Sequence, residues 1–255
     1  MIRLKRASIR EVLLLAFSAA CIFSLPSYLH ATPANPLDDD ADAPAPLIVM
    51  ADFNLDGIPD MAQVLPAGKS SSSPRVLTVL LGRKDGSFSE PVSAPTLGHD
   101  PKAIVGGDFN GDGNPDVIVG DGDGTLTEFL GDGKGNLVSA GEIAHLGSIT
   151  SIAVGDFNHD GIPDMAISDF RRSSITVLVG SRDGSFQVAW QVAVPVKQSV
   201  FRVAVADFNG DGMPDLAVTD EEDDTFQVLL GNGNGTFTYS AAMSNLKDPN
   251  SHCAT

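Results

Sequence analysis

The sequence predicts an all-β fold assembled from four copies of one unit, and three observations predict it. An acidic nonapeptide occurs four times, as "DFNLDGIPD" at 52–60, "DFNGDGNPD" at 108–116, "DFNHDGIPD" at 156–164 and "DFNGDGMPD" at 207–215. A second motif follows each copy: "LGRKDGSF" from Leu81, "LGDGKGNL" from Leu130, "VGSRDGSF" from Val179 and "LGNGNGTF" from Leu230. The segments around them are short alternating runs rich in Val, Ile and Thr, without a sustained helical period.

The spacing of the repeats predicts the architecture. Successive nonapeptides start 56, 48 and 51 residues apart, and periods of about 50 residues indicate propellers or similar arrays. The third unit divides into four strand-like segments, at 151–157, 164–170, 174–180 and 186–194. The nonapeptide joins the first two, and a Gly-containing hairpin joins the last two. Four short antiparallel strands per unit form the blade of a β-propeller, which predicts a propeller domain over 47–246 with blades at about 47–97, 101–147, 149–196 and 200–246.

The third strand of each unit is predicted to place a row of apolar side chains on one face. These are Leu77, Val79 and Leu81, then Ile175, Val177 and Val179, then Phe226, Val228 and Leu230. The second unit has Glu128 where the others have Val, and the pattern offers no reason for it.

The N-terminus is predicted to be a secretory signal peptide over residues 1–31. Four basic residues precede the apolar run "VLLLAFSAACIF" (12–23), and a cleavage site after Ala31 fits the sequence that follows. The run is short for a membrane span, although a single-span anchor and a lipoprotein signal ending at Cys21 are alternatives. A secreted, extracellular or periplasmic protein is therefore expected. Residues 32–46 are predicted to be a disordered Pro- and Asp-rich spacer, and 247–255 a tail.

The charge of the chain limits its partners. The whole sequence has a formal charge of −17, and removing residues 1–31 takes away four basic residues and one acid, which leaves about −20. Such a chain repels nucleic acid and anionic lipid. Cys21 lies in the predicted signal, so Cys253 would be the remaining thiol and no intrachain disulfide is expected.

The nonapeptide has the composition of a calcium loop. Side-chain oxygens stand at positions 1, 3, 5 and 9, with Gly at 6 and Pro at 8, and Ca²⁺ takes about six to eight oxygen ligands. The first half matches an EF-hand loop, but strands flank it and Asp closes it at position 9. Up to four Ca²⁺ ions are expected. The predicted side-chain ligands are Asp52, Asn54, Asp56 and Asp60; Asp108, Asn110, Asp112 and Asp116; Asp156, Asn158, Asp160 and Asp164; and Asp207, Asn209, Asp211 and Asp215. The position 7 carbonyls of Ile58, Asn114, Ile162 and Met213 complete the predicted set.

Other interpretations of the nonapeptide are weaker. Asp, Asn, Gly and Pro all favour metal-free turns, but a turn does not require three carboxylates in register four times. Mg²⁺ prefers water ligands and strict octahedral geometry, and the usual His or Cys ligands of zinc and copper are missing, with His159 expected to point outward. A catalytic pair of carboxylates would not need four copies, so no catalytic residue and no enzymatic activity are predicted.

The two linked motifs resemble the FG-GAP/VCBS repeat, which is known from integrin α-subunit propellers, some fungal lectins and many secreted bacterial proteins. The resemblance covers about residues 47–246 and implies a propeller with calcium in the blade loops. Propellers of this family usually have seven blades, whereas this chain has four, so it could close alone or complete a ring as a homodimer.

The resemblance implies a binding or cell-adhesion module for a protein ligand, with a calcium-dependent lectin as the alternative. The mature chain has Trp190 and Tyr239 as its aromatic residues besides Phe. Sugar sites usually offer aromatic platforms, so this composition makes the lectin alternative less favoured. Strand parity places the calcium loops and Gly hairpins at one edge of the disc. The varied loops at the opposite edge are the expected recognition surface. Arg171 and Arg172 form the one local basic pair there.

Overall fold

The computed structural model describes residues 47–66, 74–92, 95–97, 100–194, 201–220 and 225–245. Over these residues the chain forms strands, turns and bends, with no helix, and no segment could cross a membrane as a helix. The predicted all-β class is therefore confirmed. The predicted signal peptide, spacer and tail lie outside the described residues.

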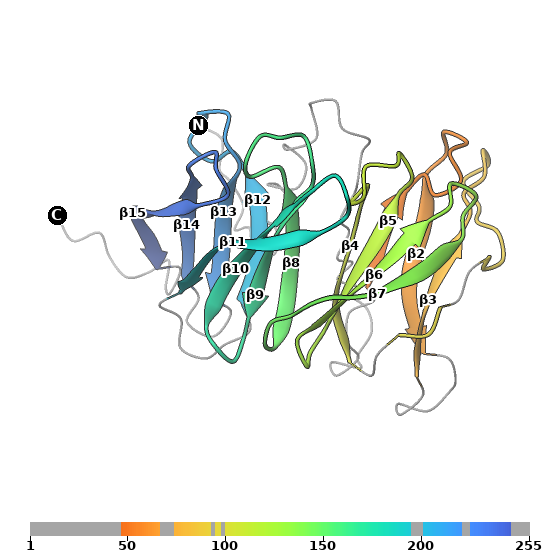
Figure 1. Ribbon diagram of the computed structural model, residues 1–255, viewed down its shortest axis with the longest axis horizontal. Coiled ribbons are helices and arrows are strands. Elements are labelled where there is room, and N and C mark those ends of the chain that lie inside the picture. The colour runs from red at the N-terminus through yellow and green to blue at the C-terminus, as the bar shows by residue number, and fades with distance from the viewer. Residues whose placement is uncertain are drawn as a thin grey trace, which may run out of the picture.

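The strands form four antiparallel sheets that follow one another along the chain (Figure 1). Each sheet is a meander in which sequential strands are neighbours, and we call the sheets blades 1 to 4. Blade 1 contains β1 (Ile48–Ala51), β2 (Asp60–Pro66) and β3 (Arg75–Leu80). Blade 2 contains β4 (Pro101–Gly107), β5 (Asp116–Asp121), β6 (Thr125–Gly131) and β7 (Leu137–His145). Blade 3 contains β8 (Ile149–Gly155), β9 (Asp164–Asp169), β10 (Ser174–Gly180) and β11 (Phe186–Ala193). Blade 4 contains β12 (Phe201–Ala206), β13 (Asp215–Asp220), β14 (Thr225–Gly231) and β15 (Phe237–Asn245).

Blade 1 differs in its fourth segment. Isolated bridges pair Gly82 with Phe88 and Val76 with Thr96, in place of a continuous strand. Backbone hydrogen bonds still run along β3: the Leu77 N–H donates to the Pro95 carbonyl and the Leu97 N–H to the Arg75 carbonyl, at 3.0 and 2.9 Å. Each blade thus has a fourth segment along its third strand, and in blade 1 this segment is irregular.

Both faces of each central strand carry apolar side chains, because the blades stack face to face. Val49, Val79, Val117 and Phe129 are among the residues of a core between blades 1 and 2. A second core joins blades 2 and 3, and a third joins blades 3 and 4. The hydrophobic effect therefore acts between blades.

The first strands of the blades connect the array. β4 packs on β1, β8 on β4 and β12 on β8. In the described residues β1 and β12 do not pack together in this way, and the first and fourth blades lie at opposite ends of the row (Figure 1). The four blades form an open arc.

Candidate metal centre

The four nonapeptides, which we call acid loops, link the first and second strands of each blade and share one conformation. Each loop closes on the carboxylate at position 1. Asp52 accepts the N–H groups of Asp56 and Gly57 at 3.0 and 2.7 Å, and Asp108 accepts those of Asp112 and Gly113 at 3.0 and 2.9 Å. The same pairs of bonds are made to Asp156 and Asp207. Gly at position 6 has φ between 81 and 87°, a conformation that explains the Gly.

Positions 3 and 5 curl around the same centre. In the third loop the Asn158 Oδ1 accepts the Asp160 N–H at 3.0 Å, and the Asn158 Nδ2 donates to Asp160 Oδ2 at 2.9 Å. Asp160 Oδ1 in turn accepts the Ile162 N–H at 2.8 Å. The other three loops repeat all three bonds. Side-chain oxygens of positions 1, 3 and 5 therefore gather at one exposed turn.

The Asp at position 9 has a different environment, since Asp60, Asp116, Asp164 and Asp215 are all fully buried. In the third blade one Asp164 oxygen accepts the Phe157 N–H at 2.8 Å and the other accepts the Gly180 N–H at 2.9 Å. The equivalent glycines Gly82, Gly131 and Gly231 donate to their own Asp at 2.7, 2.9 and 2.8 Å. This carboxylate ties the acid loop to the start of the Gly hairpin.

A steric contact accompanies that hydrogen bond. A Cβ at Gly82, Gly131, Gly180 or Gly231 would lie between 2.1 and 2.4 Å from the carbonyl oxygen of the Pro at position 8. The first Gly of the second motif is therefore required by the first motif, and the two motifs are parts of one junction. Sequence reasoning assigned the hairpin glycines to turn geometry and missed this contact. The constant order of the two motifs was the signal that could have revealed it.

Burial disfavours the ionised form of the position 9 carboxylates in blades 1 to 3. Burial raises the pKa of Asp116 to about 7 and that of Asp164 to about 6, against the hydrogen bonds from Gly131 and Gly180 that lower them. Neighbouring carboxylates add to the rise: Asp112 and Glu128 act on Asp116, and Asp160 and Asp156 on Asp164. The pKa of Asp60 is also raised, mainly by burial. Each of these loops concentrates negative charge that a cation would neutralise.

The donor set fits a hard cation. Only oxygen donors gather in the loops, which suits Ca²⁺ better than zinc or copper. Within the described residues no group of three His, Cys, Asp or Glu side chains is already arranged as a metal cluster. In each loop, backbone N–H groups instead satisfy the oxygens of positions 1, 3 and 5. Hydrogen bonds join the predicted ligands of positions 1, 3 and 5 at one turn in every blade, whereas the Asp of position 9 is buried and bonded to the hairpin Gly. The binding of calcium by these residues stays a prediction. His159 has an exposed side chain.

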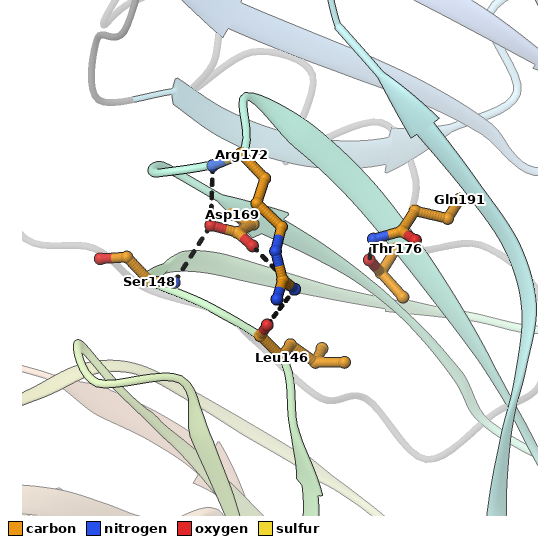
Figure 2. A network of polar contacts seen from close by, with 6 residues as sticks. All are labelled: Leu146, Ser148, Asp169, Arg172, Thr176 and Gln191. Carbon is orange, nitrogen blue, oxygen red and sulfur yellow. Dashed lines mark hydrogen bonds and ion pairs between the residues drawn. The ribbon is translucent and has the colours of Figure 1, made fainter.

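At the edge of the blades opposite the acid loops, buried carboxylates bind the backbone of the links between blades. Asp169, at the end of β9, accepts the N–H groups of Ser148 and Arg172 at 3.1 and 3.2 Å (Figure 2). The Arg172 guanidinium lies 3.5 Å from the second Asp169 oxygen and also donates to the Leu146 carbonyl. In blade 2 the buried Asp121 likewise accepts the Asp100 N–H at 3.0 Å. These acids tie the links between blades to the sheets, and Arg172 is engaged in that network.

Glu128 is a further residue whose environment sequence reasoning could not give. Its side chain is 5% exposed, and its Oε1 has no hydrogen-bond partner among the residues that the structure describes. Burial raises the pKa of this carboxyl. Its cross-strand partners are Ile118 and Gly141, and Ile118 belongs to the core between blades 2 and 3. Nothing in the structure explains the Glu.

Comparison with solved structures shows the same fold. The crystal structure of BBS1N in complex with ARL6DN, soaked with lead, is similar at 15% identity with a TM-score of 0.55. The match covers 80% of this chain and 57% of that chain, so this chain spans little more than half of it. A second crystal structure of that complex, soaked with mercury, matches at 11% identity with a TM-score of 0.43, over 76% of this chain and 63% of that chain. No curated protein matches the chain in sequence.

Comparison with family models identifies the repeats. The model of the FG-GAP-like repeat matches four overlapping segments, residues 52–119, 108–167, 160–218 and 207–253. Each match contains an acid loop with its second motif or the strands that follow it, and together they span most of the chain. The protein is therefore a member of the FG-GAP-like repeat family, with its blades arranged as in a β-propeller.

Proposed function

We propose that this protein is a secreted, non-catalytic binding module whose blades are stapled by calcium at the acid loops. The observation that carries the proposal is the identical closure of all four loops, with the oxygens of positions 1, 3 and 5 at one turn and a buried Asp at position 9. A catalytic site would need one such loop, whereas a structural device is repeated with the blade. Secretion is supported by the sequence of residues 1–31 alone.

The residues that would hold the ion are those at positions 1, 3, 5 and 9 of each loop, with the position 7 carbonyl. Bound Ca²⁺ would supply positive charge among carboxylates that otherwise repel one another. Because the Asp at position 9 also accepts the hairpin Gly N–H, holding this carboxylate ionised strengthens the junction between both motifs. Extracellular calcium modules bind with dissociation constants of about 10⁻⁴–10⁻³ M, so millimolar calcium would be required.

Calorimetric titration of the protein with calcium tests the proposal. We expect up to four sites, and the variant Asp160→Ala should lose one of them. Asp183→Ala, which removes an exposed carboxylate from the hairpin of the same blade, is the matched control and should keep all sites. At ten times the dissociation constant each site adds about 1.4 kcal/mol to stability. Absence of binding heat together with an unchanged melting curve in chelator would refute the calcium staple.

A protein is the proposed ligand of the module, bound at the edge opposite the acid loops. The similar BBS1N structure is a complex with ARL6DN, which supports protein binding by this fold. The loops at that edge differ between blades, whereas the acid loops are nearly constant, and variable loops on a fixed scaffold usually carry recognition. A carbohydrate ligand is the alternative, and a glycan array read in calcium separates the two, because binding to glycans would favour the lectin. A second copy of the chain is a separate candidate partner.

A further inference from the structure

Each blade has two faces, and the blades stack face to face. We call the face that the next blade covers the trailing face, and the face that packs on the preceding blade the leading face. In blade 3 the trailing face has the row Ala153, Ala166 and Val177, and Phe157 lies beside it. The ring of Phe157 meets Phe237 of blade 4 edge to face at 5.3 Å, and Phe157 is 2% exposed. The trailing faces of blades 1 and 2 are buried in the same way, with Phe53 and Phe109 fully covered.

The trailing face of blade 4 has the same chemistry, and none of the described blades covers it. Its row is Ala204, Ala217 and Val228, in the same cross-strand register as the row of blade 3. Phe208 is the counterpart of Phe157, yet it is 42% exposed. A side chain that three blades bury is exposed in the fourth, because no other blade that the structure describes packs on it.

The leading face of blade 1 is the matching open end. Met50, Met61 and Leu80 form a row across its strands, and all three are only half-buried. In blade 4 the equivalent leading row contains Leu216 and Leu229, which are fully buried against blade 3. The apolar surface of blade 1 is thus of the kind that covers a trailing face elsewhere in the arc.

An alternation of Gly and larger residues at the junctions favours blade 1 as the partner of blade 4. Where position 4 of an acid loop carries a side chain, the next hairpin has Gly at positive φ, Gly133 or Gly233. A Cβ there would first meet its own blade, at 2.5 Å from Asn114 or 2.4 Å from Met213, and the side chain of the preceding loop is also near, with Leu55 at 3.1 Å and His159 at 3.6 Å. Where position 4 is Gly111, the next hairpin has Arg182, whose carbonyl oxygen is 3.9 Å from a Cβ built on that Gly. Each junction therefore has one Gly and one larger residue.

Blade 4 has Gly210 at position 4, so the alternation continues if the blade that covers it has a larger hairpin residue. Blade 1 supplies Lys84 at that place. Its hairpin also has the closure of the blade 3 hairpin, since the Gly86 N–H bonds to Arg83 within the hairpin as the Gly184 N–H bonds to Ser181, both at 2.9 Å. In blades 2 and 4 the corresponding Gly135 and Gly235 N–H groups instead bond to Phe53 and Phe157 of the preceding blade.

Charge favours the same pairing. Arg83 and Lys84 are exposed on the hairpin of blade 1, and Asp207 and Asp211 are exposed on the acid loop of blade 4. Opposite charges at a rim steer association and fix register. Blade 4 and blade 1 of one chain lie at opposite ends of the arc (Figure 1), so the partner has to come from another molecule.

We infer that the trailing face of blade 4 binds the leading face of blade 1 of a second copy, twice over, giving a two-chain ring of eight blades. Such a head-to-tail contact closes when the rotation allows it, and two chains keep the alternation of Gly and larger residues at every junction. The inference takes the second copy from the proposed partners as its occupant. Its apolar contacts do not depend on calcium, whereas a bound ion would reduce the attraction of Asp207 and Asp211 for the hairpin of blade 1.

The mass of the full chain in solution, expressed with its own N-terminal segment and measured by light scattering and native mass spectrometry, tests the ring. We expect twice the mass of one chain. Phe208→Asp should weaken association by about 100-fold or more, whereas Val188→Asp, at a 60% exposed apolar residue away from both end faces, should leave the dimer intact. Calorimetry with calcium on the same samples keeps failure of the ring distinct from failure of the staple.

An exchange of sizes at the junction gives the sharper test. Gly210→His adds a side chain that His159 shows to be compatible with positive φ at this position, so the variant should fold and be monomeric. Adding Lys84→Gly restores the pattern of the blade 3 to blade 4 junction and should restore the dimer. A wild type with the mass of one chain, or of more than two, would overturn the two-chain ring. Failure of Lys84→Gly to rescue would overturn the junction assignment.

Discussion

Replacing Gly180 with Ala should damage the junction between the two motifs of blade 3. A Cβ there would lie 2.4 Å from the Pro163 carbonyl oxygen and 3.2 Å from the Ile162 side chain, both closer than van der Waals contact. Two neighbouring backbone segments must separate by about 1 Å to reach an ordinary contact distance of about 3.4 Å. The Gly180 N–H donates to Asp164 at 2.9 Å across the same gap, so relieving the clash stretches this hydrogen bond.

The cost can be estimated from two contributions. Forcing a methyl group into a packed site costs about 1–3 kcal/mol, and losing a hydrogen bond to a buried carboxylate costs about 1.5–3 kcal/mol. Together they give about 2.5–6 kcal/mol, a large part of the roughly 5–15 kcal/mol that stabilises a typical domain. For a chain of this length the melting temperature should fall by roughly 5–24 °C.

Urea denaturation in chelator measures this loss, with Gly161→Ala as the control. Gly161 has φ +81°, and nothing lies within 4 Å of a Cβ built on it, so this variant reports backbone strain alone, about 1–2 kcal/mol. The chelator removes any effect of the control on calcium. If Gly180→Ala cost no more free energy of unfolding than Gly161→Ala, the close approach of the two motifs would not be a determinant of stability.

Three further outcomes are expected. Glu128→Val should raise the free energy of unfolding at neutral pH by about 1–3 kcal/mol, because it removes a buried oxygen without a partner, and a loss in urea denaturation would contradict this. In chelator, the free energy of unfolding should fall as pH rises from about 4 to about 7. Burial raises the pKa of Asp116 to about 7 in the folded chain, so the folded state favours the protonated carboxyl. Saturating calcium should remove this dependence on pH, and thermal melts across pH measure it. Phe157→Ala should cost about 3–5 kcal/mol, whereas Phe208→Ala should cost less than half of that in the dissociated chain, and equal losses would refute the difference in burial.

The fold could be predicted from the repeat, because the strand and turn pattern of a blade is contained within one repeat unit. Strand alternation around Val177 and the turn residues of the acid loop are determined within about 50 residues, so the blades, and the edge on which the loops lie, could be predicted. The sequence also places the oxygens of positions 1, 3 and 5 close together, because they lie within one turn of the chain, and hydrogen bonds join them there.

What could not be predicted depends on contacts between segments that are distant in sequence. Asp164 looked equivalent to the other loop carboxylates, yet its hydrogen bond to Gly180 spans 16 residues and buries it fully. The sequence showed Arg172 only as one half of a local basic pair, whereas in the structure it contacts Asp169 and a carbonyl 26 residues earlier in the chain. The sequence shows which side chains are present, but it does not show which distant residues they contact.

The arrangement of sizes at the junctions adds a constraint that single blades do not contain. Blades 1 and 3 share the loop ending "DGIPD" and the hairpin ending "DGSF", and blades 2 and 4 share a Gly at position 4 and a Gly in the hairpin. The structural unit is therefore a pair of unlike blades, in which each hairpin fits the loop of the other type. A ring that keeps this fit must contain an even number of blades, and it can close only by bringing a loop of the blade 4 type against a hairpin of the blade 1 type. The open ends of this chain carry that combination, so the proposed ring continues across chains the pattern of residues that is found at the junctions within one chain.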